Sequence, residues 1–227
     1  MKIDLTEIYK GLAEWRAERG ITAESQKAGY LVNVMEEFGE LAQALRDYEK
    51  IKNGERALRA GIFDIKSTLG EMTIFEGTTK GEIEITLEKA EYEIIDALCD
   101  ISVFTINAWA DLPSAVKPLI IEAKREFSVA DIFVAIADFI RTDVNNSPFV
   151  NGSPFNYYDF ARILRCCASV CEQYGFNFQI AMDETIKEIS SRTGSYDEKA
   201  KKWVKDISDE ARAKWYSANY ELARIKK

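Results

Sequence analysis

The sequence predicts an all-α protein, because both its composition and its hydrophobic periodicity favour helices. Only 12 glycines and 4 prolines occur among 227 residues, so long stretches carry no helix breaker. Hydrophobic residues make up 47% of the chain and charged residues 30%, which is typical of a globular protein with a sizeable core. Apolar residues recur every three or four positions. We therefore expect a helical bundle that forms a single domain over residues 1–227.

The first half of the chain is expected to form three helices. Gly20 ends the first of them, and Asn53-Gly54 stops the second. The third closes before Leu112-Pro113, because proline disfavours helix in the residue that precedes it. Residues 54–81 carry five glycines and form either an irregular insertion or a small hairpin, and the pattern does not separate the two. The expected helices span about 4–18, 22–53 and 82–110.

The second half is expected to hold four more helices, each marked by a capping residue. Ser128 and Asp131 have the spacing of a capping box, and Asn156 and Asn177 are typical N-caps. Ser208 has the same role in a last helix that carries Trp215, Tyr216 and Tyr220. The expected helices span about 128–142, 156–174 and 177–192, followed by this last one.

Charge and cysteine usage exclude several classes of protein. The formal net charge of -8 argues against binding to a nucleic-acid polymer, which requires a basic face. No apolar run approaches the roughly 20 residues that span a bilayer, so no membrane is expected. The cysteines lie in apolar helical runs and are expected to fill the core, which with the absence of a signal-peptide pattern favours a reduced, cytoplasmic protein. They are Cys99, Cys166, Cys167 and Cys171.

Two acids in the second predicted helix project toward a neighbouring helix. At about 100° per residue, Glu36 lies opposite the apolar stripe, which centres on Val34. Glu37 and Glu40 instead lie along one flank of that stripe. A lone Glu-x-x-Glu is usually a solvated face, so this pair carries little weight by itself.

The third predicted helix carries the stronger signal, because apolar residues cover almost its whole circumference. Glu93, Asp96 and Asp100 nevertheless share one face, and Asn107 continues the same arc two turns later. Buried carboxylates at this spacing repel one another and lose hydration, so they require a cation or several donors to stay ionised. The chain has no histidine, so a metal site here would have to be oxygen-only or thiolate, and the ion we expect at these acids is Mg²⁺, with Mn²⁺ as a substitute.

The segments EEFGELAQAL and EYEIIDALCDISVF resemble the paired motif of the all-α nucleoside triphosphate pyrophosphohydrolases, which include MazG-like proteins and dimeric dUTPases. The resemblance covers about residues 25–110, and residues 118–227 would form the second helical half with the phosphate-binding tail. The glycine-rich insertion is longer than in compact members. The family pattern, Glu-x-x-Glu followed by Glu-x-x-Asp, implies metal ligands at Glu37, Glu40, Glu93 and Asp96.

This resemblance implies Mg²⁺-dependent hydrolysis of a deoxynucleoside triphosphate, such as dUTP or dCTP, to the monophosphate and pyrophosphate. One carboxylate not fully engaged by metal would accept the proton of the attacking water, and we assign that role to Glu37 first and Asp100 second. The preferred base, the phosphorus attacked and the number of metal ions stay open. The resemblance also implies a homodimer, which the apolar and aromatic content supports.

A basic run near the C-terminus is the expected phosphate-binding segment, because a triphosphate carries more negative charge than one Mg²⁺ offsets. Lys187 and Arg192 are the preferred candidates, and Tyr196 lies in a turn with free amides that would fold over phosphate. Asn107 completes the predicted substrate-binding set. The alternative for the basic run is a solvated tail.

Two rival interpretations remain for the chain as a whole. A di-iron carboxylate bundle normally requires Glu-x-x-His ligands, and the chain contains no histidine. A non-catalytic helical scaffold would use the acids as a charged face, and its tryptophans, like those of most proteins, would serve as core or partner contacts. Such a scaffold predicts no effect of Mg²⁺ on stability.

Overall fold

The protein is mainly helical, as the sequence predicts, and its layers are built around one central helix. The computed structural model describes residues 2–59, 80–108, 120–123, 126–145, 157–197 and 202–226. The helices are α1 (Thr6–Glu18), α2 (Ala23–Arg59), α3 (Lys80–Ala108), α4 (Val129–Asn145), α5 (Tyr157–Gln173), α6 (Phe178–Ser191) and the single turn α7 (Asp209–Arg212), followed by the 3-10 helix η3 (Tyr220–Ala223).

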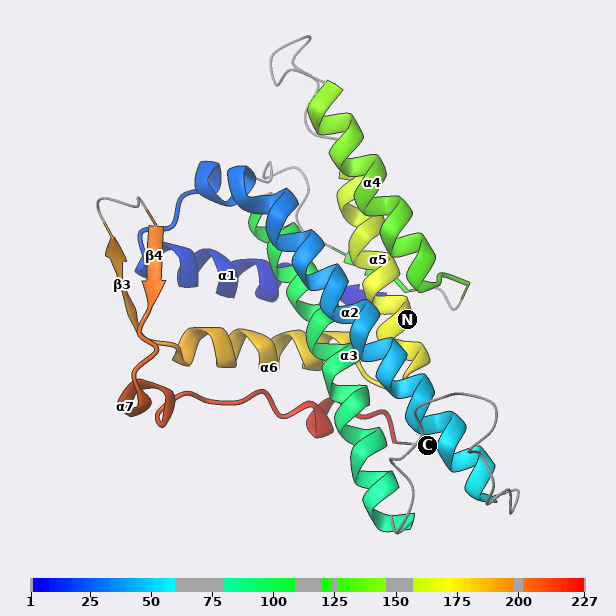
Figure 1. The fold of residues 1–227 in the computed structure, drawn as a ribbon. Helices are drawn as coiled ribbons and strands as arrows, with labels where there is room; N and C mark the ends of the chain where they lie inside the picture. The colour runs from blue at the N-terminus through cyan, green and yellow to red at the C-terminus, as the bar shows by residue number, and fades with distance from the viewer. Residues whose placement is uncertain are drawn as a thin grey trace.

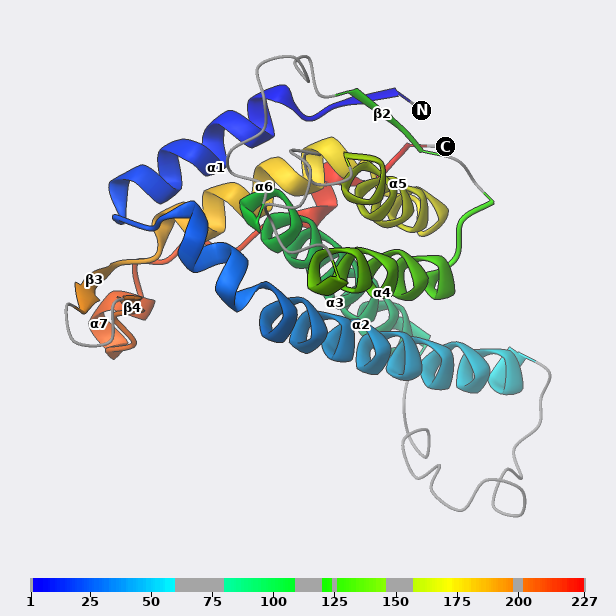
Figure 2. The ribbon, with the colours of Figure 1, turned by 90° about the horizontal axis from the view of Figure 1, so that it is seen from above.

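Helix α3 is central and contacts α1, α2, α5 and α6. The long helices α2 and α3 lie side by side and run in opposite directions (Figure 1). Helices α1 and α6 lie on the opposite side of α3 from α2, as the view from above shows (Figure 2). The middle of α3 is apolar on nearly every side and fully buried at Ile94, Ile95 and Leu98, which explains its position in the core.

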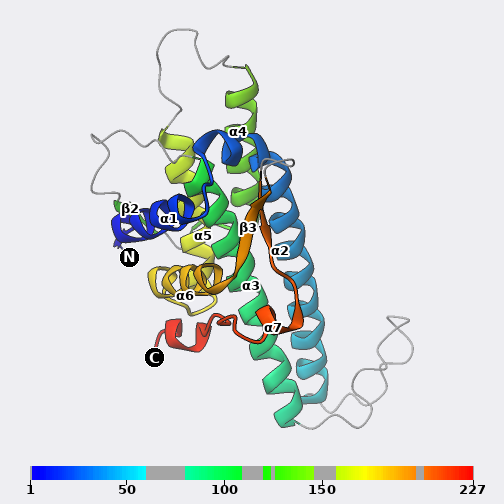
Figure 3. The same cartoon turned by 90° about the vertical axis from the view of Figure 1, so that its left-hand side faces the viewer.

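Two short antiparallel sheets complete the fold. Strand β1 (Lys2–Asp4) pairs with β2 (Ile120–Glu122), and β3 (Gly194–Asp197) pairs with β4 (Lys202–Lys205). The β3–β4 hairpin follows the end of α6 on the left-hand side of Figure 1, and in Figure 3, where that side faces the viewer, it lies in front of α2 and α3. A Cβ atom at Gly194 would lie 2.3 Å from the backbone oxygen of Val204, so the start of this hairpin requires glycine.

Several helix ends follow the predicted capping chemistry. Gly20 has a positive φ of 64°, the left-handed conformation that ends a helix. The side chain of Asn177 accepts from the backbone N–H of Ile180, and that of Ser208 accepts from Ala211. The carboxylate of Asp131 accepts from the backbone N–H of Ser128 at 2.7 Å, which is one half of a capping box. These local signals therefore place the helix starts that follow Ser128, Asn177 and Ser208.

Other predicted boundaries are wrong. Helix α2 continues through Asn53-Gly54 to Arg59, and Gly54 is buried, so packing outweighs the cost of about 1 kcal/mol for glycine inside a helix. The first helix starts at Thr6 rather than Asp4, because Lys2–Asp4 pairs with β2. The predicted turn at residues 193–196 contains strand β3.

The predicted last helix is also wrong, because it is reduced to α7 and η3 with non-helical chain between them. The reason is tertiary. The backbone N–H groups of Ala218 and Asn219 donate to the carboxylates of Glu188 and Glu184 instead of to helical carbonyls.

Some predictions fall outside the described residues. They concern most of the insertion at 54–81, the end of the third helix at Leu112-Pro113 and the cap at Asn156. In the part of the chain that is described, no helix has the length and apolarity needed to cross a bilayer.

Candidate active site

The four predicted metal ligands come from the two helices that pack together along the bundle. Glu37 and Glu40 lie on α2, and Glu93 and Asp96 lie on α3. Glu37 and Asp96 are half-buried, whereas Glu40 is exposed. Glu93 is also exposed, so the prediction that apolar surroundings bury it is wrong. The acids therefore extend from solvent at Glu40 and Glu93 to the interior at Glu37 and Asp96.

The half-buried acids are close enough to destabilise one another's charged forms. Burial raises the pKa of Glu37 to about 7, and repulsion from Glu40 and Asp96 acts in the same direction. Burial likewise raises the pKa of Asp100, with further contributions from Asp96 and Glu37. Glu37, Asp96 and Asp100 thus form a cluster of negative charge across the α2–α3 contact.

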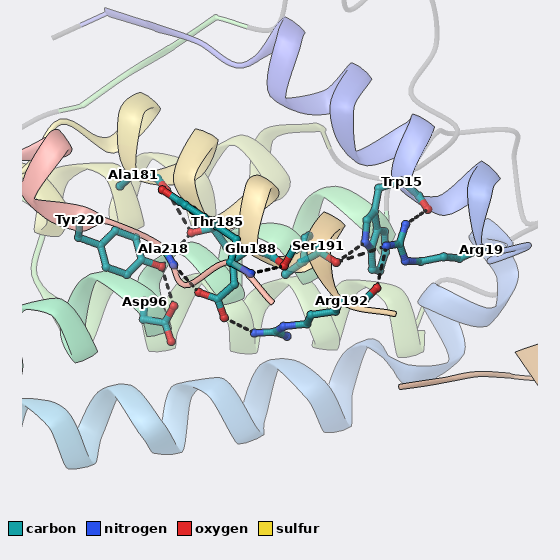
Figure 4. A network of polar contacts seen from close by, with 12 residues as sticks. Trp15, Arg19, Asp96, Ala181, Thr185, Glu188, Ser191, Arg192, Ala218 and Tyr220 are labelled. Atoms are coloured by element: carbon teal, nitrogen blue, oxygen red, sulfur yellow. Dashed lines mark hydrogen bonds and ion pairs between the residues drawn. The ribbon is translucent and has the colours of Figure 1, made fainter. Parts of the chain in front are cut away.

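The C-terminal segment reaches this cluster through Tyr220. The Tyr220 hydroxyl donates to Oδ1 of Asp96 at 2.6 Å, and the Thr185 hydroxyl of α6 lies 3.0 Å from the same tyrosine oxygen (Figure 4). Burial raises the pKa of Asp96 overall, although the bond from Tyr220 lowers it. Tyr220 therefore fixes the position of one oxygen of the Asp96 carboxylate.

Arg192, at the end of α6, brings positive charge to the same region. Its guanidinium donates to Glu188 at 2.5 Å, and Glu188 also accepts from the backbone N–H of Ala218 (Figure 4). Arg192 lowers the pKa values of both Asp96 and Asp100, although desolvation outweighs this effect at each acid. The acids on α3 and the cation after α6 therefore act on one another electrostatically.

A cavity of about 480 Å³ joins these elements. Five of the nine predicted site residues line it, although they come from α2, α3, the end of α6 and β3. The other four are the predicted metal ligands Glu40, Glu93 and Asp96, together with Lys187. The predicted residues in the lining are Glu37, Asp100, Asn107, Arg192 and Tyr196.

The cavity wall also contains aromatic residues, two of them held by a single arginine. The Arg19 guanidinium lies 5.1 Å from the ring centre of Trp15 and 5.2 Å from that of Trp203. It also donates to the backbone oxygens of Ser190 and Arg192. Arg19 thus connects α1 to the end of α6 and to the hairpin, and Trp15, Trp203 and Phe104 line the cavity.

Lys205 is a cavity cation that the sequence analysis missed. Desolvation and the nearby Arg192 lower its pKa, whereas Asp100 and Glu37 favour its charged form. Lys205 lies in β4, and alternation along a short strand gives no signal that singles out one lysine among several. Pairing with β3 brings this residue to the cavity.

Lys187 has a different environment from Arg192. Its ammonium donates to the buried carboxylate of Glu184, and its side chain is exposed and does not line the cavity. Glu184 also accepts from the Tyr216 hydroxyl and the backbone N–H of Asn219. Lys187 thus belongs to the contact between α6 and the C-terminal segment.

The donor set fits a divalent cation in its chemistry. Glu37, Asp96 and Asp100 are carboxylates whose repulsion and desolvation a positive ion would offset. Within the described ranges, however, no three acidic or thiol groups converge closely enough to enclose an ion.

Comparisons of this chain with models of protein families, with curated proteins and with solved structures found no match.

Proposed function

We propose that this protein is a Mg²⁺-dependent pyrophosphohydrolase that converts a deoxynucleoside triphosphate to its monophosphate and pyrophosphate. One observation carries the proposal: a single cavity is lined by carboxylates at Glu37 and Asp100, by cations at Arg192 and Lys205, and by aromatic rings. A nucleotide requires this combination, because its base is flat and apolar and its phosphates bind both metal and positive side chains. The motif resemblance supports the same reaction and an all-α pyrophosphohydrolase type of bundle.

The acids would hold the metal from two sides of the α2–α3 contact. Glu37 and Glu40 would act from α2, and Glu93 and Asp96 from α3. When bound, Mg²⁺ would offset charge on the phosphate oxygens and lower the pKa of a bound water. Glu37 is the residue we assign to accept the proton from that water, with Asp100 as the second candidate, because both line the cavity.

The cations would bind the phosphates that the metal does not reach. Arg192 and Lys205 line the same cavity as Glu37 and Asp100, and each interacts electrostatically with Asp100. In the structure Arg192 is held by Glu188, so phosphate would share or replace that partner. Tyr196 of β3 lies beside them in the cavity wall and is exposed, which suits a phosphate-contacting hydroxyl.

The decisive experiment combines hydrolysis assays with substitution of the exposed acids. Wild-type protein is incubated with each canonical dNTP and Mg²⁺, and the products are resolved by chromatography. Glu40→Gln and Glu93→Gln should each abolish turnover while helical circular dichroism stays native, since each removes a metal charge at an exposed site. Removal of Mg²⁺ by a chelator should have the same effect.

Glu49→Gln is the matched control, because Glu49 is also an exposed glutamate on α2 but lies nine residues after Glu40, on the opposite face of the helix and about 13.5 Å farther along its axis. It should retain wild-type turnover. Wild-type turnover in Glu40→Gln or Glu93→Gln would refute the assignment, as would the absence of pyrophosphate among the products of every dNTP.

A helical interaction protein is the second candidate function. Leu31 and Val32 on α2 and Phe133 on α4 are exposed, with Val32 at 69%, and such residues suit a partner surface or the expected homodimer. A melting curve with and without Mg²⁺ separates the two functions. An ion that binds only the native state raises the midpoint, whereas a scaffold with a solvated acidic face shows no specific shift.

A further inference from the structure

Asn107 carries a buried hydrogen-bond donor that the described part of the chain does not satisfy. Its side chain is 1% exposed, and it lines the cavity near the end of α3. Its amide nitrogen, Nδ2, has no hydrogen-bond partner among the residues that the structure describes. A buried unpaired amide is costly and uncommon in folded proteins, so a missing partner at a cavity wall points to a ligand.

The orientation of this amide is determined by a second buried residue. Arg16 of α1 is 5% exposed, and its guanidinium donates to Oδ1 of Asn107 at 2.5 Å. A guanidinium has only donors, so the atom that faces it must be the amide oxygen. Asn107 therefore cannot flip, and the unsatisfied group of its amide is the donor Nδ2.

The surroundings of Asn107 suit a planar ring. Val103 and Phe104 lie one turn before it on the same helix, and Trp15 stands on the facing α1. The indole N–H of Trp15 already donates to the backbone oxygen of Ile189 at 3.1 Å. Trp15 and Phe104 thus contribute apolar ring surface rather than polar groups, which leaves Asn107 to read the edge of a bound ring.

The position of Asn107 relative to the acids determines which edge it meets. Asp100 precedes it by two helical turns, about 10.5 Å along the axis. A nucleotide whose phosphates lie at Glu37 and Asp100 would extend its base toward Asn107. The edge of the base that is farthest from the sugar would then face Asn107. That edge carries the exocyclic group at position 4 of a pyrimidine.

We propose that Asn107, held by Arg16, selects bases that present a carbonyl oxygen at this edge over bases that present an amine there. The inference rests on the proposed nucleotide-binding function and names the class of nucleotide within it. A keto pyrimidine supplies the acceptor that Nδ2 lacks, whereas an amino pyrimidine places a second donor against it. Loss of one such bond in a closed site corresponds to at least tenfold in affinity.

The test compares non-hydrolysable α,β-imido analogues of dUTP and dCTP by calorimetry in the presence of Mg²⁺. Wild-type protein should bind the dUTP analogue at least tenfold more tightly. Asn107→Asp keeps the bond to Arg16 and replaces the donor by an acceptor, so it should reduce the ratio of the two affinities at least tenfold. Asn33→Asp is the matched control, because it adds the same charge elsewhere in the cavity wall and should leave the ratio unchanged.

Equal binding of the two analogues by the wild-type protein overturns the inference. This measurement needs no variant, so the inference can be tested even if Asn107→Asp does not fold. An unchanged ratio in a folded Asn107→Asp protein overturns it as well. Hydrolysis of dNTPs without base preference contradicts only the role of Asn107. The predicted binding preference without hydrolysis supports the role of Asn107 and contradicts the proposed function. The absence of any nucleotide binding contradicts both the role of Asn107 and the proposed function.

Discussion

Tyr220→Phe tests whether the C-terminal segment positions a residue of the metal site. The substitution removes only the hydroxyl that donates to Asp96 at 2.6 Å and approaches Thr185 at 3.0 Å. Tyr220 is 5% exposed, and a hydrogen bond to a charged group contributes about 1.5–3 kcal/mol. We therefore expect a loss of about 2 kcal/mol in the free energy of unfolding. For a domain of this size the melting temperature should fall by about 4–8 °C.

If Tyr220 had only a structural role, the substitution would lower stability and have no other effect. The second measurement is therefore the affinity of the protein for Mg²⁺. Asp96 would lose the donor that fixes one of its oxygens, and loss of such an outer partner typically weakens metal binding 10–100-fold. Calorimetric titration with Mg²⁺ measures this directly. Tyr216→Phe is the matched control, because Tyr216 lies in the same segment and also donates to a carboxylate, that of Glu184.

Tyr216→Phe should leave the affinity for Mg²⁺ unchanged. Two results would refute the reasoning. One is an unchanged melting temperature in Tyr220→Phe, which would show that the bond to Asp96 contributes nothing to stability. The other is the same Mg²⁺ affinity in both variants, which would show that Tyr220 does not position Asp96 for metal.

The cationic side of the cavity and the C-terminal contact yield two further predictions. Arg192→Ala should raise the Michaelis constant or slow turnover at least tenfold, which corresponds to about 1.4 kcal/mol. Lys187→Ala should behave as wild type, because Lys187 pairs with Glu184 and does not line the cavity. Steady-state kinetics measure both variants, and equal effects would contradict the different roles assigned to Arg192 and Lys187. Desolvation favours the protonated form of Glu184, but hydrogen bonds from Lys187, Tyr216 and Asn219 outweigh desolvation and lower the pKa of Glu184 below its ordinary 4.5. The ionised carboxylate therefore stabilises the fold above pH 4.5, and this stabilisation is lost as the pH falls through the lowered pKa. The urea midpoint should accordingly decline below pH 4.5 more steeply in the wild type than in Glu184→Gln, and parallel curves for the two proteins would count against this role.

Helix starts and the faces of the carboxylates could be predicted because both depend on residues close together in the chain. A cap such as Asn177 bonds to an N–H three residues away, and the positions of Glu37 and Asp100 follow from 3.6 residues per turn. Glu37, Asp100, Asn107, Arg192 and Tyr196 line one cavity, and that they form one functional site stays a prediction. Which reaction they perform stays a prediction.

Only the tertiary structure decided the features that depend on distant partners. Arg16 meets Asn107 across 91 positions, and Tyr220 meets Asp96 across 124, and no local periodicity encodes either pair. The segment after Ser208 has a helical pattern, yet Glu184 and Glu188 capture its backbone N–H groups and hold it out of a helix. Local sequence sets the intrinsic preference of a segment for helix, strand or turn. A buried carboxylate that needs hydrogen-bond donors can override that preference, and the partners of the carboxylate are determined only when the helices pack together.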